Sequence, residues 1–196
     1  EQEWSMKYLH RLMVLSQLYR RNSSTLEADV ATLSRDPENR SYWRMNARRM
    51  ESQLIRDNIL HLANDLDHQF FGPSLALNNP EVRRRSCYLF HSNIQREPFL
   101  ATFDDASVLD AYRRQESIVP QQALALENSD LVHNHLDQIA NALLAQSQSA
   151  PSQQDVHVAF MSILGRSATE AEWQALQIAM QSWIDVSDIT PTAQHI

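Results

Sequence analysis

The sequence predicts an all-α fold, or a predominantly α fold with at most one short pair of strands. The 196 residues include only two glycines, Gly72 and Gly165, and no Asn-Gly or Asp-Gly pair of the kind that closes tight β-hairpins. Apolar residues recur mostly at helical spacing. We therefore expect an irregular multi-helix bundle that ends in a helical hairpin.

Two helices are expected near the N-terminus. Residues 4–21 carry a wide apolar face and are followed by the polar sequence Asn22-Ser23-Ser24, which is typical of a helix end. Residues 26–33 predict a second, shorter helix.

A third helix is predicted from an Asp-Pro start. Asp36 would cap it, and Pro37 suits the first helical position because its missing N–H costs nothing there. Glu38 adds favourable charge to the first turn. The helix would run to about residue 66, and its apolar and aromatic positions would be Trp43, Ala47, Met50, Leu54 and His61.

The middle of the chain is less regular. Residues 70–80 contain Gly72-Pro73 and a proline at position 80, and we expect a loop. Residues 86–94 predict either a short strand or a buried helical turn, because periodicity does not separate these over so few residues.

A second proline-started helix is predicted from Pro120 through Leu143, followed by a polar linker at residues 146–151. Two helices, residues 153–164 and 170–186, would then form a hairpin. Gly165 would end the first of them, and Thr169 with Glu172 has the spacing of a capping box. The side chains expected to bury in the hairpin are Phe160, Ile163, Leu164, Trp173, Leu176, Met180 and Trp183. We divide the chain into a main domain, residues 1–148, and this hairpin, residues 149–196, packed as one structural unit.

Charge is distributed unevenly along the chain. Of 17 basic residues, all but Arg166 lie at or before Arg114, whereas the net charge of the whole chain is −7. This acidity disfavours broad binding to nucleic acids, which needs a positive field. No apolar run is long enough to cross a membrane. Because the chain begins without methionine, we expect it to be part of a longer protein, and the absence of a signal peptide is uninformative.

The arginines near the Asp-Pro start suggest an anion site. Arg40, Arg44 and Arg48 follow one another at four-residue spacing and would share a helical face. The candidate residues for an anion such as sulfate, a uronate or a haem propionate are Arg44, Arg48, Arg49, Arg113 and Arg114. Pairing of these arginines with the chain's own carboxylates is the alternative that we favour.

Few other residues suggest catalysis or metal binding. His61, Asp65 and His68 would share a face of a continuous helix, and they are a weak candidate for zinc or iron. Asp104 and Asp105 with Glu97 are candidate paired carboxylates, although capping is the more ordinary role of such acids. The single cysteine, Cys87, lies in an apolar run and predicts a buried, inert thiol. No Gly-x-Ser-x-Gly elbow or glycine-rich phosphate loop occurs.

Several motifs, in this order and at this spacing, resemble those of one family. They lie at residues 5–12, 36–57 (DPENRSYWRMNARRMESQLIRD), 72–74, 84–90 (RRSCYLF), 99–104, 117–126 and 164–172. The chain resembles the C-terminal domain of large planctomycete exported proteins, known as domain of unknown function 1553. Many members have a cysteine shortly before the arginine pair that matches Arg113 and Arg114. Residues 108–112 of this chain contain none, so no thiol or metal role is expected there.

The resemblance implies export to the periplasm or cell surface and a companion domain upstream, often with a cytochrome c domain before it. Haem would then belong to an attached domain, and we expect no cofactor in this chain. Two functions are open. One is a non-catalytic helical binding module, with the upstream domain and a polysaccharide as expected partners. The other is part of an enzyme or electron-transfer protein acting on extracellular polysaccharide or another organic substrate, with a site shared with the upstream domain.

Overall fold

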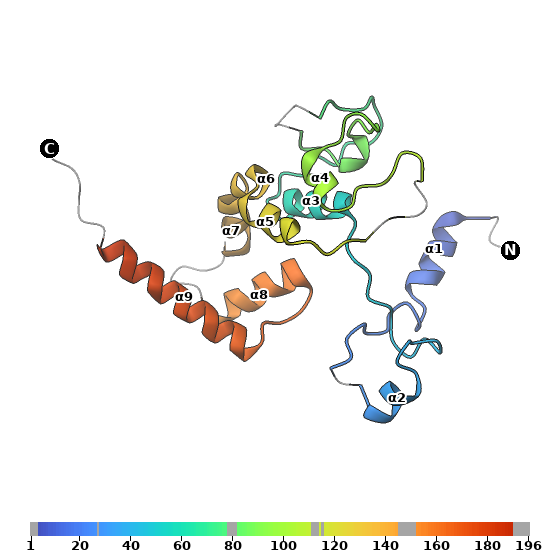
Figure 1. The fold of residues 1–196 in the computed structure, drawn as a ribbon, viewed down its shortest axis with the longest axis horizontal. Helices are drawn as coiled ribbons and strands as arrows, with labels where there is room; N and C mark the ends of the chain where they lie inside the picture. Colours follow the sequence, from blue (N-terminus) through green and yellow to red (C-terminus); the bar gives the residue numbers. More distant parts are fainter. Residues whose placement is uncertain are drawn as a thin grey trace. The chain divides into compact units, whose positions relative to one another are not determined.

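The regular structure of the chain is almost entirely helical (Figure 1). The computed structural model describes residues 4–26, 28–77, 82–110, 114, 116–144 and 152–189. In these ranges, strand-type pairing is limited to isolated bridges that join Asp67 to Arg84 and Leu75 to Leu89. The predicted all-α class is confirmed. None of the described helices is both long and apolar enough to cross a lipid bilayer.

The chain forms two compact units, Glu1–Met50 and Glu51–Ile196. The domain boundary that we predicted at residues 148 and 149 remains a prediction. The linker predicted beside it, residues 146–151, lies outside the described residues. Each unit is described by itself below.

The first unit contains two short helices. Helix α1, Met6–Val14, is capped by Ser5, whose hydroxyl oxygen accepts a hydrogen bond from the Tyr8 amide at 3.3 Å. Helix α2 spans Val30–Arg35. Both are shorter than predicted, and the apolar face of α1 is open, since Leu9, Leu12 and Met13 are 40%, 58% and 51% exposed.

The helix predicted from Pro37 is wrong over its first half. Asp36 ends α2 instead of starting a helix, and its carboxylate accepts hydrogen bonds from the amides of Arg40 and Ser41 at 2.8 and 2.7 Å. These hydrogen bonds lower the pKa of Asp36, with the Ser41 amide making the largest contribution. The chain then turns at Asn39 and Tyr42, whose φ angles of 58° and 54° lie in the left-handed region.

Asn39 explains this turn. It is only 2% exposed, and its side chain donates to Arg44 O and Asn46 Oδ1, both at 2.8 Å, while accepting from the Arg44 amide at 3.1 Å. A buried amide that satisfies its donors and acceptor locally outweighs the helical propensity of its neighbours. Only the second half of the predicted helix forms, as α3, Ser52–Leu62.

The second unit is built around α3. Its closest packed pairs are α3 with α4 (Pro98–Thr102), and α3 with the 3₁₀ turn η1 (Ser86–Tyr88). The Phe99 and Phe103 rings lie 4.9 Å apart. The buried apolar residues of this core are Leu60, Ala63, Leu89, Phe99, Leu100 and Phe103. Residues 86–94, for which we left strand or helical turn open, thus begin with a 3₁₀ turn followed by the bridge at Leu89.

The predicted helix start at Pro120 is confirmed, but the helix, α5, is shorter than predicted and spans Pro120–Asn128; it packs on α4. Buried Gln122 holds the two helices together, because its side-chain amide donates to Thr102 O at 3.0 Å. Ser129 then breaks the predicted helix and accepts a hydrogen bond from the Val132 amide at 3.4 Å, at the start of α6, Asp130–His133. Helix α7 follows at Leu136–Leu144.

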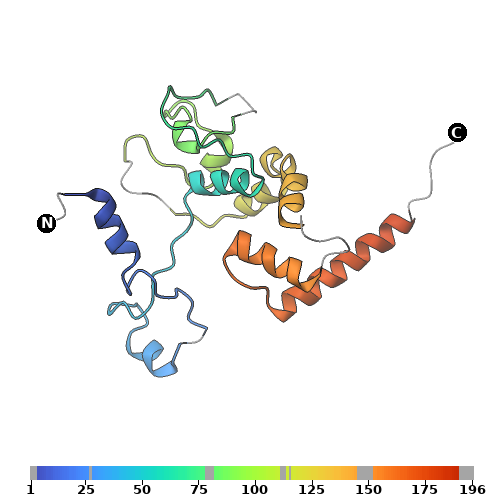
Figure 2. The ribbon, with the colours of Figure 1, turned by 180° about the vertical axis from the view of Figure 1, so that it is seen from behind.

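The C-terminal helices form where they were predicted. Helix α8 spans Gln153–Leu164 and ends at Gly165 with a left-handed φ of 67°, and α9 spans Glu170–Ile189 (seen from behind in Figure 2). The predicted burial is partly wrong. Ile163 and Leu164 are 45% and 55% exposed, and α8 with α9 is not among the closely packed pairs of described helices. The Trp183 side chain lies outside the described residues.

The predicted capping box at the start of α9 is confirmed. The Thr169 amide donates to Glu172 Oε2 at 2.8 Å, and Arg166 donates to both Glu172 oxygens at 2.9 and 2.7 Å. These hydrogen bonds, that from Arg166 first, lower the pKa of Glu172 from 4.5 to about 2. Because the folded-state pKa is depressed, the contribution of Glu172 to stability is complete above pH 4.5 and is lost as the pH falls towards 2.

We predict that the Glu172 carboxyl titrates with a midpoint near 2 in the folded chain. The substitution Arg166→Gln should raise this midpoint towards the ordinary value, because it removes the largest cause of the shift. An NMR titration of the side-chain carboxyl measures both. A wild-type midpoint near 4.5 would show that the Arg166–Glu172 pair does not form.

Candidate functional site

The arginines predicted as an anion site do not share a helical face. Residues 39–51 are irregular, so the geometry on which that prediction rested is wrong. Arg40 pairs with Glu38 at 2.6 Å in solvent, and the Arg44 guanidinium lies 5.4 Å from the centre of the Trp43 ring. Arg48 is exposed and has no ion pair with any described residue, whereas Arg49 makes an interaction. Binding of an anion by Arg44, Arg48 and Arg49 remains a prediction.

The structure describes only one residue of the second predicted arginine pair. Arg113 lies outside the described residues. Arg114 Nη1 donates to Gln53 Oε1 at 2.7 Å, and Arg114 Nη2 lies 3.4 Å from Glu51 Oε2. Arg114 therefore joins residues at the start of α3.

The weak metal candidate does not converge. Helix α3 ends at Leu62, and Asn64 turns the chain with a φ of 56°. The rings of His61 and His68 lie 6.4 Å apart edge to face, but Asp65 turns to other partners, His135 at 3.1 Å and Arg83 at 3.2 Å. Within the described ranges, no three His, Cys, Asp or Glu residues form a group that could hold a metal.

The best-defined polar site lies along α3 and starts from a buried arginine. Arg56 is 6% exposed, and its guanidinium donates to Val82 O at 2.5 Å and Arg84 O at 3.0 Å. Asp57 lies 3.6 Å from the Arg56 guanidinium and accepts from the Ser86 amide at 2.7 Å. Burial lowers the pKa of Arg56, opposed first by Asp57. Together these contacts fix residues 82–86 against α3.

Arg84 extends this framework to the preceding loop. Its guanidinium lies 3.9 Å from the centre of the Tyr88 ring and donates to Gln69 O at 3.1 Å and Phe71 O at 2.6 Å. The Tyr88 hydroxyl accepts from the Phe71 amide at 2.9 Å. Residues 84–90 thus contact both α3, through Ser86, and the loop at residues 69–71, through Arg84 and Tyr88.

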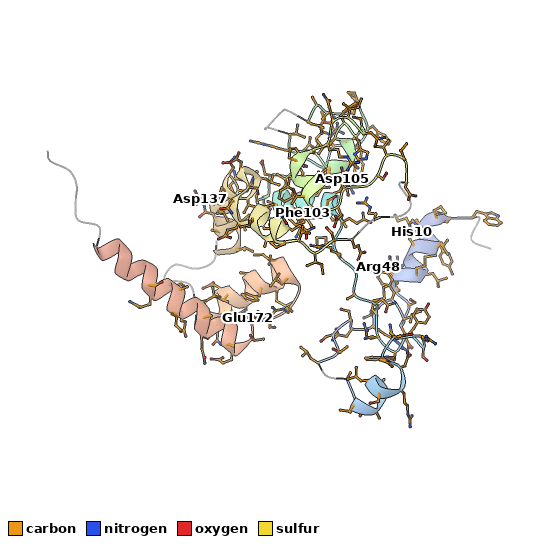
Figure 3. The ribbon with its side chains drawn as sticks, in the orientation of Figure 1. His10, Arg48, Phe103, Asp105, Asp137 and Glu172 are labelled. Carbon is orange, nitrogen blue, oxygen red and sulfur yellow. The ribbon has the colours of Figure 1, made fainter. Side chains whose placement is uncertain are left out.

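A chain of polar contacts crosses the same side of α3. From Arg114, bonded to Gln53 Oε1 as described above, it continues through Gln53 Nε2, which donates to Asp105 Oδ1 at 2.5 Å. Asp105 Oδ2 lies 3.3 Å from His91 Nδ1. The Asp105 side chain is 1% exposed and that of His91 is 35% exposed, so a buried carboxylate faces a half-exposed imidazole. Figure 3 shows Asp105 near Phe103, which ends α4.

This polar chain borders a pocket of about 370 Å³. We call it the His91 pocket. Its lining comes from the start of α3, from residues 85–91, and from Leu100, Asp105, Ala106 and Arg114. Within residues 85–91, the Arg85 guanidinium lies 4.0 Å from Asp57. The volume suits a small ligand.

Cys87 also lines the His91 pocket and is exposed, so the prediction of a buried thiol is wrong. The reason is that η1 turns the apolar run, which leaves Ser86 and Leu89 inside and Cys87 outside.

The other candidate carboxylates have structural partners. Glu97 accepts from the Leu100 amide at 2.5 Å at the start of α4. Asp104 accepts from the Ser117 amide at 2.7 Å and from its hydroxyl at 2.8 Å. Only Asp105 of the three faces the His91 pocket, so they do not form a carboxylate pair.

Sequence analysis missed His91 altogether. It directly follows the family motif at residues 84–90 but belongs to no catalytic motif, and its partner Asp105 was considered only as a paired carboxylate with Asp104 and Glu97. Gln53, which links Asp105 to Arg114, is separated from Asp105 by 52 positions. A single sequence carries no local signal for such contacts.

Comparison with known proteins identifies a family but no function. The model of the PSD1 family, described as a protein of unknown function (DUF1553), matches residues 1–180. The chain belongs to this family. The resemblance to domain of unknown function 1553 is therefore confirmed, whereas planctomycete origin and export remain predictions. No curated protein matches the chain. No solved structure matches it either.

We predict that Arg56→Ala destabilises the second unit by about 3–5 kcal/mol, because it removes the nearer of the two arginines that face Asp57 and leaves the carbonyl oxygens of Val82 and Arg84 without their donor. The free energy of unfolding, measured with urea, tests this. Arg40→Ala is the matched control, since the Arg40 side chain is 82% exposed, and it should change stability by no more than about 0.5 kcal/mol. Equal stabilities of the two variants would contradict the structural role of Arg56.

Proposed function

We propose that this chain is a ligand-binding module of a larger exported protein, and that the His91 pocket takes a small anionic group. The observation that carries the proposal is the loose pairing of the two arginines on the pocket wall. Arg114 lies 3.4 Å from a Glu51 side chain that is itself 53% exposed, and Arg85 lies 4.0 Å from Asp57. Such partly exposed pairs contribute little, so an incoming carboxylate or sulfate competes with them readily.

The geometry favours a planar or bidentate anion. Arg114 is already oriented by its hydrogen bond to Gln53 at 2.7 Å, which reduces the entropy lost when its remaining N–H groups bind a ligand. A uronate on a polysaccharide offers such a carboxylate, and a sulfate ester offers a comparable group.

Family membership supports the setting of this proposal. Through the resemblance to planctomycete exported proteins, we propose a periplasmic or cell-surface location and a companion domain upstream. Any haem would reside on an attached cytochrome c domain. The open apolar face of α1 suits a partner-binding role, since Leu12 and Met13 lie largely in solvent.

The second candidate is an enzyme whose site is completed by the upstream domain. The contact between Asp105 and His91 favours it, because a buried carboxylate beside a half-exposed imidazole is an arrangement used in acid–base catalysis. Turnover that appears only when the upstream domain is attached would favour this candidate.

We predict that glucuronate binds the chain and that Arg114→Gln weakens this binding about 10- to 100-fold, the loss expected for a charge-assisted hydrogen bond. Isothermal titration calorimetry with glucuronate, inorganic sulfate and neutral glucose measures the preference and separates the two anion sources. Arg40→Gln, in the first unit, is the matched control and should bind as wild type does. Equal glucuronate affinities of wild type and Arg114→Gln would contradict the proposed anion site.

A further inference from the structure

The two oxygens of the Asp105 carboxylate differ in their surroundings, and one of them faces His91. Its Oδ1 is satisfied by Gln53 Nε2 at 2.5 Å and by the Ala106 amide at 2.8 Å. Its Oδ2 is buried and accepts no hydrogen bond from the described residues, although His91 Nδ1 lies 3.3 Å away. An unsatisfied buried carboxylate oxygen costs free energy, so its retention calls for an explanation, and a catalytic role is one that the neighbouring imidazole supports.

This placement sets the chemistry of His91. A carboxylate oxygen attracts an N–H and repels a lone pair, so it favours the tautomer with the proton on Nδ1. The lone pair of the neutral ring then lies on Nε2, which has no partner among the described residues. With 35% of its side chain exposed, His91 reaches the pocket while Asp105, 1% exposed, stays shielded from water.

Arg114 supplies the complementary group. It lines the same pocket as His91 and is connected to it through Gln53 and Asp105. The pocket therefore brings together a proton acceptor, a residue that orients it, and a guanidinium that binds a carboxylate.

We propose that the His91 pocket is a hydrolytic site for esters that carry a free carboxylate. This inference rests on the proposed function, since Arg114 binds the carboxylate. His91 Nε2 takes a proton from water as the water oxygen forms a bond to the ester carbonyl carbon. The tetrahedral intermediate collapses, the bond to the leaving oxygen breaks, and that oxygen takes the proton from the imidazolium. The products are a carboxylic acid and an alcohol.

Asp105 is a positioning residue in this step. It holds the ring orientation and stabilises the imidazolium, as the buried carboxylate does in serine hydrolases. The 3.3 Å separation between His91 Nδ1 and Asp105 Oδ2 is longer than a good hydrogen bond, and such contacts often tighten only when substrate binds. If the contact between His91 and Asp105 were purely structural, His91 Nε2 would take part in no reaction.

The test uses two chromogenic probes, the 4-nitrophenyl monoester of succinate, which carries a carboxylate, and neutral 4-nitrophenyl acetate. We expect wild type to hydrolyse the succinate probe at least about tenfold faster than His91→Gln. Exposed His133 provides the control, and His133→Gln should match wild type. Asp105→Asn should lower kcat and alter its pH dependence, and Arg114→Gln should lower kcat/KM for the succinate probe alone.

Chemical rescue guards against misfolding. Added imidazole should restore hydrolysis by His91→Ala. Equal rates for wild type and His91→Gln, or for His133→Gln and His91→Gln, would overturn the inference. If wild type binds glucuronate but does not hydrolyse the succinate probe, the inference is overturned and the proposed binding function stays intact. If wild type neither binds glucuronate nor prefers the charged probe, the anion site itself is overturned.

Discussion

The second unit depends on satisfying charged groups that α3 and its neighbours bury. Arg56 and Asp105 are almost completely removed from water, and Asp57 is 12% exposed. A buried charge costs several kcal/mol unless it is paired and hydrogen-bonded. The chain meets this cost with backbone groups of residues 82–86 and with Gln53. The positions that these hydrogen-bonding partners must occupy determine the path of the loops around α3.

The pocket is a consequence of this framework. Because Arg56 and Asp57 hold Ser86, and Arg84 holds the loop before it, the segment that carries His91 starts from a fixed position. Loops held by rigid elements place functional side chains more precisely than free loops do. The apolar contact of Phe99 with Phe103 fixes α4, and Asp105 follows it directly. The same contacts that stabilise the unit thus bring the carboxylate to the imidazole.

Local signals predicted much of the fold and little of the site. Gly165, Thr169 with Glu172, and Pro120 are terminal signals whose effect is confined to one turn, and each was correct. The Asp-Pro start failed because buried Asn39 satisfies its amide within a turn, an outcome that depends on burial and not on spacing. The pairing of His91 with Asp105 and Gln53 joins distant positions, so no periodicity could indicate it. Family motifs located the segment 84–90 without revealing what it supports.

The central claim is that a buried carboxylate fixes the tautomer of His91 and leaves Nε2 open to the pocket. Long-range ¹H–¹⁵N NMR correlation of the His91 ring at neutral pH, in wild type and in Asp105→Asn, measures this most directly. The account predicts a proton on Nδ1 and a bare Nε2 in wild type, with the preference lost in the variant. A wild-type ring protonated on Nε2, or a tautomer unaffected by Asp105→Asn, would contradict it.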